Sequence, residues 1–174
     1  MKKKISELCL VSDCLHITPE YESDGYPMVR VSEIGNKFLS LSDALNVSED
    51  NYIKYTMNYV PQNGDIILAR VGAFLGQFAY VDTDQKFCIG QNTTILHPYA
   101  YNKYIFYNLI SEVTQSRIKK EAAGSAYKSV GVDAIKNFSI DIPQDKDAEK
   151  IGDFLYKIDK RIQINRQIND NLAA

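Results

Sequence analysis

The sequence lacks any long apolar run. Within its 174 residues, no stretch approaches the roughly 20 apolar residues that a transmembrane helix needs. The N-terminal segment "MKKKISELCLVSD" is rich in lysine, but Glu7 and Asp13 interrupt the apolar core that a signal peptide requires. We therefore expect a cytoplasmic protein with no membrane partner.

Cysteine and histidine are scarce. Cys9, Cys14 and Cys88 contain no Cys-x-x-Cys pair, and three cysteines cannot all be bridged, which is typical of a reducing compartment. The gaps that separate Cys9, Cys14 and His16 match no usual spacing of zinc ligands. The sequence thus predicts buried thiols and no metal site. For His16 and His97, which lie in no catalytic motif, we expect structural or surface roles.

Catalytic motifs are also absent. The sequence has no glycine-rich phosphate loop, Walker lysine motif, nucleophile elbow or HExxH pattern, and no Asn-Pro-Pro-Tyr-like signature of an amino-methyltransferase. One fragment, "VDTDQK", offers Asp84 and Lys86 as half of a metal-dependent nuclease site, with Asp65 as a second carboxylate. The same residues also suit an ordinary turn. We expect a non-catalytic chain without a cofactor, with the nuclease as the alternative.

The composition is that of a folded protein. Hydrophobic residues make up 45% and charged residues 24% of the chain, and its length allows one domain plus one appendage. The net charge is -2, yet residues 101–140 alone carry +3 and the remainder carries -5. A basic segment in an acidic chain is a place where phosphate could dock. A solvated helix face is the alternative.

Hydrophobic patterns predict a mixture of strands and helices. We expect strands over 5–12, 27–34, 65–71, 77–82 and 137–143, with short strands around Gly90–Asn92. A turn marked by Gly72 and Gly76 joins the strands 65–71 and 77–82. Helices are expected after Ser48, from Tyr101 to about Ala122, and from Asp145 onward. In the middle helix, one apolar stripe consists of Ile105, Phe106, Leu109, Ile110 and Val113. The predicted class is α+β, with a mixed, mostly antiparallel sheet and a long C-terminal coiled-coil helix.

The terminal helix carries a seam with a coiled-coil period. The seam consists of Ile151, Leu155, Ile158, Ile162, Asn165, Asn169 and Leu172. Its steps alternate between four and three residues, which is the 3.5-residue repeat of a coiled coil. A helix of about 40 Å is too long for its own domain to cover, so we expect a partner helix, with the asparagines fixing the register. The alternative is a core helix docked on its own domain, with Asn165 and Asn169 near solvent.

Four segments in order carry a family resemblance. They are "GDIILARVGAFLGQFAYVD", "GSAYKSV", "IDIP" and "IGDFLYKIDKRIQINRQINDNL". Together they resemble the DNA-specificity subunit of type I restriction–modification systems. The resemblance implies a target-recognition domain over residues 1–144 and a conserved spacer helix over 145–174. It also implies that the chain itself does not catalyse, and that S-adenosylmethionine, Mg²⁺ and ATP belong to partner subunits.

The resemblance further implies the partners. These are double-stranded DNA, methyltransferase (modification) subunits, a restriction subunit reached through them, and a second spacer helix or a second copy of the chain. Most family members hold two recognition domains and two spacers, whereas this sequence has one of each. It is then either a half-subunit that self-associates or part of a two-domain subunit, and the lack of a stop signal after "NLAA" favours the latter.

Sequence-specific reading of DNA requires polar side chains that reach base edges, and positive charges that hold phosphates. The candidate base readers are loop residues beside predicted strands or glycines: Arg70, Gln77, Gln91, Asn92, Tyr127, Lys128 and Ser129. The candidate phosphate contacts are Arg117, Lys119 and Lys120. For each residue, an exposed loop position without any contact is the alternative. For the whole chain, the alternative is a coiled-coil adaptor that binds no DNA.

Overall fold

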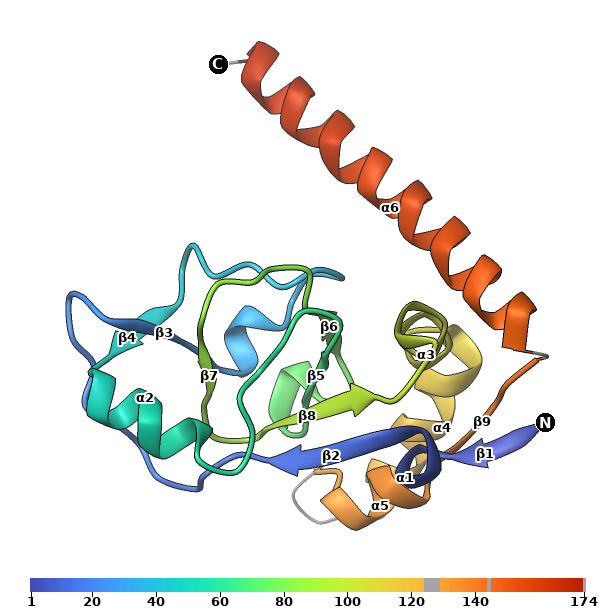
Figure 1. Ribbon diagram of the computed structural model, residues 1–174, viewed down its shortest axis with the longest axis horizontal. Helices are drawn as coiled ribbons and strands as arrows, with labels where there is room; N and C mark the ends of the chain where they lie inside the picture. Colours follow the sequence, from blue (N-terminus) through green and yellow to red (C-terminus); the bar gives the residue numbers. More distant parts are fainter. Residues whose placement is uncertain (124–128, 144, 174) are drawn as a thin grey trace.

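The computed structural model describes residues 1–123, 129–143 and 145–173. Strands and short helices form a body that contains the N-terminus, and one long helix, α6 (Asp145–Ala173), runs away from it (Figure 1). The far end of α6 projects beyond the other elements. Within the described residues, none of the helices is long and apolar enough to cross a bilayer.

The central sheet is antiparallel throughout. Its strands, in spatial order, are β2 (Cys9–Asp13), β8 (Thr93–Pro98), β5 (Ile66–Ala69) and β6 (Phe78–Tyr80). All four residues of β5 are buried, because both faces of this strand are covered, and a strand covered on both faces reads as a continuous apolar run. The 3-10 helix η2 (Gly72–Phe74) leads into the turn to β6, and Gly72 and Gly76 adopt φ values of +70° and +79°. The predicted glycine turn is confirmed.

Two smaller sheets flank the central one. The first consists of β4 (Leu45–Val47), β3 (Tyr26–Val29) and β7 (Cys88–Ile89), and in it β3 and β7 run parallel. The second pairs β1 (Lys2–Lys4) with β9 (Ser139–Asp141). The turn at Gly90–Asn92 therefore separates two strands that belong to different sheets. The predicted α+β class with mostly antiparallel pairing is confirmed.

The prediction of one strand over 5–12 is wrong in its first half. Residues Ile5–Leu8 form a short helix, α1, and β2 follows. Ile5 and Leu8 are three residues apart and both are buried, which a helical turn permits and an alternating strand does not. The backbone N–H of Lys4 donates to the Glu7 carboxylate at 2.7 Å and fixes the start of this turn. The predicted strand 27–34 ends early as well, because the 3-10 helix η1 (Val31–Glu33) follows β3.

The helix predicted after Ser48 is confirmed as α2 (Glu49–Thr56), with the Ser48 hydroxyl accepting from the backbone N–H of Asn51 at 3.3 Å. The single helix predicted from Tyr101 is instead two helices. They are α3 (Asn102–Leu109) and α4 (Glu112–Ala123), and α5 (Val132–Asn137) comes next.

The break between α3 and α4 lies at Ser111. Its hydroxyl donates to the carbonyl of Asn108 at 2.7 Å and accepts from the backbone N–H of Thr114 at 3.4 Å, as a residue at a helix start does. Val113, which the sequence places in the apolar stripe, is 72% exposed. The stripe therefore ends before α4, because the change of direction turns Val113 to solvent.

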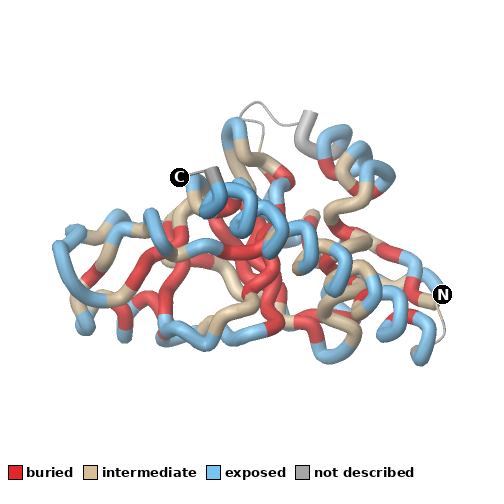
Figure 2. Tube along the Cα trace, turned by 90° about the horizontal axis from the view of Figure 1, so that it is seen from above, coloured by how far each residue is buried: buried red, intermediate tan, exposed pale blue. Residues whose placement is uncertain are grey.

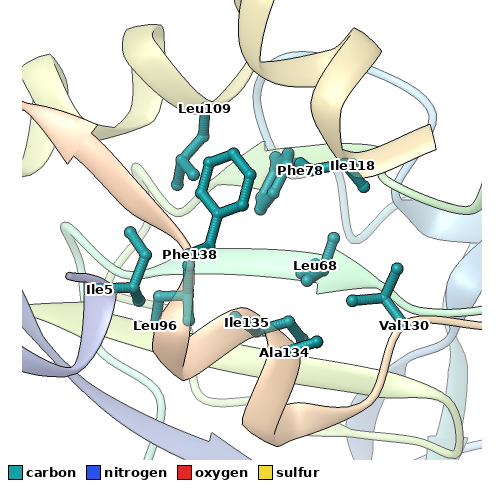
Figure 3. Close-up of a pocket in the computed structure, with 10 residues that line it drawn as sticks. All are labelled: Ile5, Leu68, Phe78, Leu96, Leu109, Ile118, Val130, Ala134, Ile135 and Phe138. Carbon is teal, nitrogen blue, oxygen red and sulfur yellow. The ribbon is translucent and has the colours of Figure 1, made fainter. Parts of the chain in front are cut away.

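One core cluster of the body lies between the central sheet and the helices α3, α4 and α5, and a second covers the other face of the sheet. In Figure 3, Leu68, Phe78, Ile118, Ile135 and Phe138 converge on one small space. The space measures about 20 Å³ and all of its lining residues are apolar. It can hold no ligand larger than a water molecule, and a water molecule would find no polar partner there. The space is a packing feature of the core.

The first half of α6 packs against α3 through small residues. Ala148 and Gly152 are buried, and a Cβ atom at Gly152 would lie 2.6 Å from the backbone nitrogen of Tyr104. Most of α6 beyond this contact is exposed (Figure 2). The inner half of α6 is therefore docked on its own domain with Asn165 and Asn169 in solvent, as the alternative expects, while the outer half is not sheltered by the described body.

Candidate nucleic-acid interface

Several candidate DNA contacts meet at one end of the central sheet. The backbone N–H of Arg70 donates to the carbonyl of Asn92 at 2.9 Å, and the Arg70 carbonyl accepts from Val130 at 3.0 Å. The neighbouring Val71 pairs with Ser129 in an isolated antiparallel bridge. Residues predicted separately from distant parts of the sequence thus lie side by side. We define the strand-end face as Asp13, Arg70, Gln77, Asn92 and Ser129.

The Arg70 side chain is held by a partner that sequence reasoning missed. Its Nη2 atom lies 2.8 Å from Oδ1 of Asp13, and the side chain is only 11% exposed. The Nη2 atom also lies 3.9 Å from the Cys14 sulfur, while the buried Nε atom has no partner among the described residues. Asp13 ends β2 and Arg70 follows β5, which is not a neighbour of β2 in the sheet. No local sequence signal could have paired them.

The other predicted base readers at or near this face differ in how exposed their side chains are and in whether they make hydrogen bonds within the protein. The Gln77 side chain is exposed, while Asn92 is half-buried in a left-handed turn with φ of 64°. In the amide orientation that satisfies its hydrogen bonds, the Gln91 oxygen accepts from the backbone N–H groups of Ile17 and Thr18. Gln91 therefore braces the loop after β2. Contact of these side chains with DNA stays a prediction.

The basic end of α4 lies beside the same turn. The Gln115 side chain donates to the carbonyl of Gly76 at 2.8 Å, which holds α4 against the loop between β5 and β6. Lys119 and Lys120 are exposed one turn further along. Arg117 instead donates to the carbonyl of Ser139 at 3.0 Å, so part of its guanidinium has a structural partner.

Two further predicted readers, Tyr127 and Lys128, lie outside the described residues. Ser129 is half-buried and lies in the bridge to Val71.

The candidate nuclease residues do not form an open metal site. Asp65 is fully buried, and its carboxylate accepts from the Tyr59 hydroxyl at 2.9 Å and from the Gln62 backbone at 2.8 Å. His97 Nδ1 lies 2.7 Å from the same carboxylate. Burial raises the pKa of Asp65, and these hydrogen bonds oppose that shift. Asp84 belongs to an exposed turn and binds Asn63.

A second surface is formed by α6, whose docked side is tied to the body by polar contacts. Lys103 Nζ lies 2.6 Å from Asp153, and Lys160 Nζ lies 2.6 Å from Asp82. Asp159 accepts from Lys37 Nζ and from the Tyr107 hydroxyl, each at 2.8 Å. Burial, together with this contact to Asp159, raises the pKa of Tyr107. These ties fix which side of α6 faces the body.

The predicted seam lies mostly outside these contacts. Ile151, Ile158 and Ile162 are each 41–42% exposed, and Leu172 is 81% exposed. Asn165 and Asn169 are exposed, and Leu155 is half-buried. An open groove also separates the outer half of α6 from the loop 35–40. The apolar seam is thus available to another helix.

Comparison with known proteins covers the body and α6 together. Residues 1–174 match the family model described as the type I restriction modification DNA specificity domain. The chain belongs to this family. The match takes in the body with its strand-end face and the whole of α6, and it confirms the resemblance found in the sequence.

The chain is similar to curated and solved members of this family. It is 24% identical over 167 residues to the type I restriction enzyme HindI specificity subunit of Haemophilus influenzae, covering 90% of this chain and 36% of that subunit. The crystal structure of a type I system S subunit from M. genitalium has a TM-score of 0.68 and 11% identity, over 99% of this chain and 42% of that one. The HsdS subunit from Thermoanaerobacter tengcongensis has a TM-score of 0.62 and 15% identity, over 97% and 39%. The specificity domain described here thus spans about two fifths of the length of these relatives.

Proposed function

We propose that this specificity domain is one DNA-reading half of a type I restriction–modification specificity subunit. Residues 1–144 would recognise part of a double-stranded DNA site, and the helix 145–174 would pair with a second spacer helix. The observation that carries the proposal is that the family match covers the body and the helix as one unit.

The strand-end face would make the base contacts. Gln77 is exposed there, Arg70 is held by Asp13, and Asn92 and Ser129 lie directly beside them. Arginine and asparagine or glutamine side chains are the usual readers of guanine and adenine edges in the major groove. Lys119 and Lys120 would bind phosphates at the side of this face, because they are exposed and α4 is tied to the neighbouring turn.

The chain would act by positioning other subunits. The exposed seam of α6 would pack on a spacer helix, and this helical platform would hold the methyltransferase subunits and, through them, the restriction subunit. S-adenosylmethionine, Mg²⁺ and ATP would be bound by those partners. The buried and fully engaged Asp65 supports a non-catalytic role over the nuclease alternative. The adaptor alternative differs in one respect, since an adaptor would bind no duplex.

The first test removes positive charges that would neutralise phosphates. We expect Lys119→Ala with Lys120→Ala to weaken binding to all duplexes and to lower the salt slope by about 0.9 for each phosphate that is no longer neutralised. Fluorescence anisotropy across a salt series measures both quantities. Lys150→Ala with Lys157→Ala, which removes two exposed lysines of α6, is the matched control and should leave the slope unchanged. A changed site preference with an intact slope would contradict the assignment of Lys119 and Lys120.

The second test removes a base reader. Arg70→Ala should relax the preference at one base pair, at a cost of about 1–3 kcal/mol, because a guanidinium contacts a single base edge. Selection from randomised duplexes, followed by affinities for single-base variants of the site, measures this preference. Arg30→Ala is the control, since Arg30 is also ion-paired, with Glu33 at 2.6 Å. Equal loss across every competitor duplex would argue against a base contact by Arg70.

A further inference from the structure

Three potential metal ligands gather where β2 ends. The Asp13 carboxylate, the Cys14 thiol and the His16 imidazole each offer one donor atom, and the three atoms lie within 4.8 Å of one another. Oδ2 of Asp13 is 3.5 Å from Nε2 of His16. Two donors bound to the same tetrahedral zinc ion stand about 3.3 Å apart. We infer that Asp13, Cys14 and His16 form a binding site for a borderline divalent cation such as Zn²⁺.

The Asp13 carboxylate is already oriented for this role. Its Oδ1 atom accepts from the backbone N–H of Cys14 at 2.9 Å and from the Thr94 hydroxyl at 3.3 Å, and it lies 2.8 Å from Arg70 Nη2. These three donors leave Oδ2 directed toward His16. Hydrogen bonds to the second oxygen are the usual means by which proteins fix a ligating carboxylate.

The loop that follows His16 is braced from two sides. The Gln91 amide accepts from the backbone of Ile17 at 3.2 Å and of Thr18 at 3.1 Å, and the Tyr55 hydroxyl donates to the Ile17 carbonyl at 2.5 Å. Because β2 fixes one end of the segment and these contacts fix the other, little conformational entropy would be lost when a metal ion binds.

The donor types select the class of metal. A thiolate and an imidazole favour zinc and similar ions over Mg²⁺ or Ca²⁺, which prefer oxygen ligands. The His16 side chain is 65% exposed, so an ion can enter from solvent, and three protein ligands leave a fourth position for water.

The chain supplies its own matched controls. Burial raises the pKa values of the Cys9 and Cys88 thiols to about 12, so neither is a thiolate at neutral pH. His97 is engaged with Asp65 and lies next to the Tyr59 ring. Within the described ranges, no second group of three such donors gathers.

The test is a titration of the purified chain with Co²⁺, whose absorption reports thiolate coordination, followed by displacement with Zn²⁺. One equivalent of Co²⁺ should give a thiolate-to-metal charge-transfer band. Cys14→Ser should abolish the band, and His16→Ala and Asp13→Asn should weaken binding at least about tenfold. Cys9→Ser, Cys88→Ser and His97→Ala should retain it. The readout involves no DNA, so its outcome is independent of the proposed function.

Two results would overturn the inference. One is the absence of a charge-transfer band at stoichiometric Co²⁺ in the unsubstituted chain. The other is a band that Cys88→Ser removes as completely as Cys14→Ser does. If Cys14→Ser alters the circular dichroism spectrum, His16→Ala decides the question, because that side chain is largely exposed and its removal leaves the fold intact.

Discussion

The two halves of α6 carry the same sequence period but meet different surroundings. In the inner half, Ala148 and Gly152 are buried against the body and Asp159 is tied to Lys37 and Tyr107. In the outer half, the seam residues Ile162 and Leu172 are 42% and 81% exposed. Both halves have an apolar seam, so the seam cannot be what docks the helix on its own domain.

The difference shows that one helix carries two separate faces, one docked on the body and one exposed to solvent, which would contact the proposed partner helix. The docking face uses small residues that allow close approach and charged residues that pair with the body. The seam face uses isoleucine and leucine, which release free energy only when another apolar surface covers them. The docking face thus fixes the direction of the helix, and the seam remains free for a partner.

The largest expected effect comes from breaking the seam. Ile162→Asp should lower the association constant for a partner spacer helix or second copy at least about tenfold, because burial of one isoleucine contributes about 1.5–3 kcal/mol. The stability of the monomer should change little, since this side chain is 42% exposed. Sedimentation equilibrium measures association, and urea denaturation measures stability.

Ile164→Asp is the matched control for Ile162→Asp. Ile164 is 51% exposed on the same helix but does not belong to the seam, so its substitution should leave association intact. If both variants associate equally, or if the unsubstituted chain associates with neither itself nor a separate spacer helix, the two faces do not have separate roles.

The next effect concerns the docking face. In an exposed helix, glycine to alanine stabilises by up to about 1 kcal/mol. Gly152→Ala should instead destabilise the chain by about 1–3 kcal/mol, because the new Cβ would lie 2.6 Å from the Tyr104 backbone and 3.1 Å from Lys103. Urea denaturation checks the sign. Gln167→Ala in the exposed outer half is the control and should be neutral, while stabilisation by Gly152→Ala would exclude this close packing.

The sequence predicted the elements whose signals are local. The start of α6 at Asp145, the Ser48 cap and the turn at Gly72 and Gly76 are all confirmed, because caps, glycine turns and periodicity act over a few neighbouring residues. The break at Ser111 had such a signal, a serine cap with glutamate in the first helical turn, but the apolar stripe across it concealed the break.

The sequence predicted which loops contribute to the candidate site, but not which of their side chains contact one another. The loops at strand ends could be identified from sequence, but the pairing of Asp13 with Arg70 joins residues from two strands that are not neighbours in the sheet. The same limit applies to the proposed metal ligands. Spacing rules for cysteine and histidine do not cover a trio whose third member is a carboxylate, and Asp13 acquires its orientation from Thr94 and Arg70.

The smallest expected effect is a pH-dependent contribution to stability from an acidic residue in the inner half of α6, which an acidic residue in the outer half should not make. The hydrogen bond from Lys103 holds the pKa of Asp153 below its ordinary value of 3.8. This ion pair therefore stabilises the fold above pH 3.8 and is lost as the pH falls through the lower pKa of the folded state. The side chains are partly exposed, so the contribution is small.

Asp153→Asn should lower the free energy of unfolding at neutral pH, and the difference from the unsubstituted chain should vanish in acid. Asp170→Asn, in the exposed outer half, should have no effect at either pH. An equal effect of the two substitutions would mean that the polar ties do not distinguish the docked half from the projecting half.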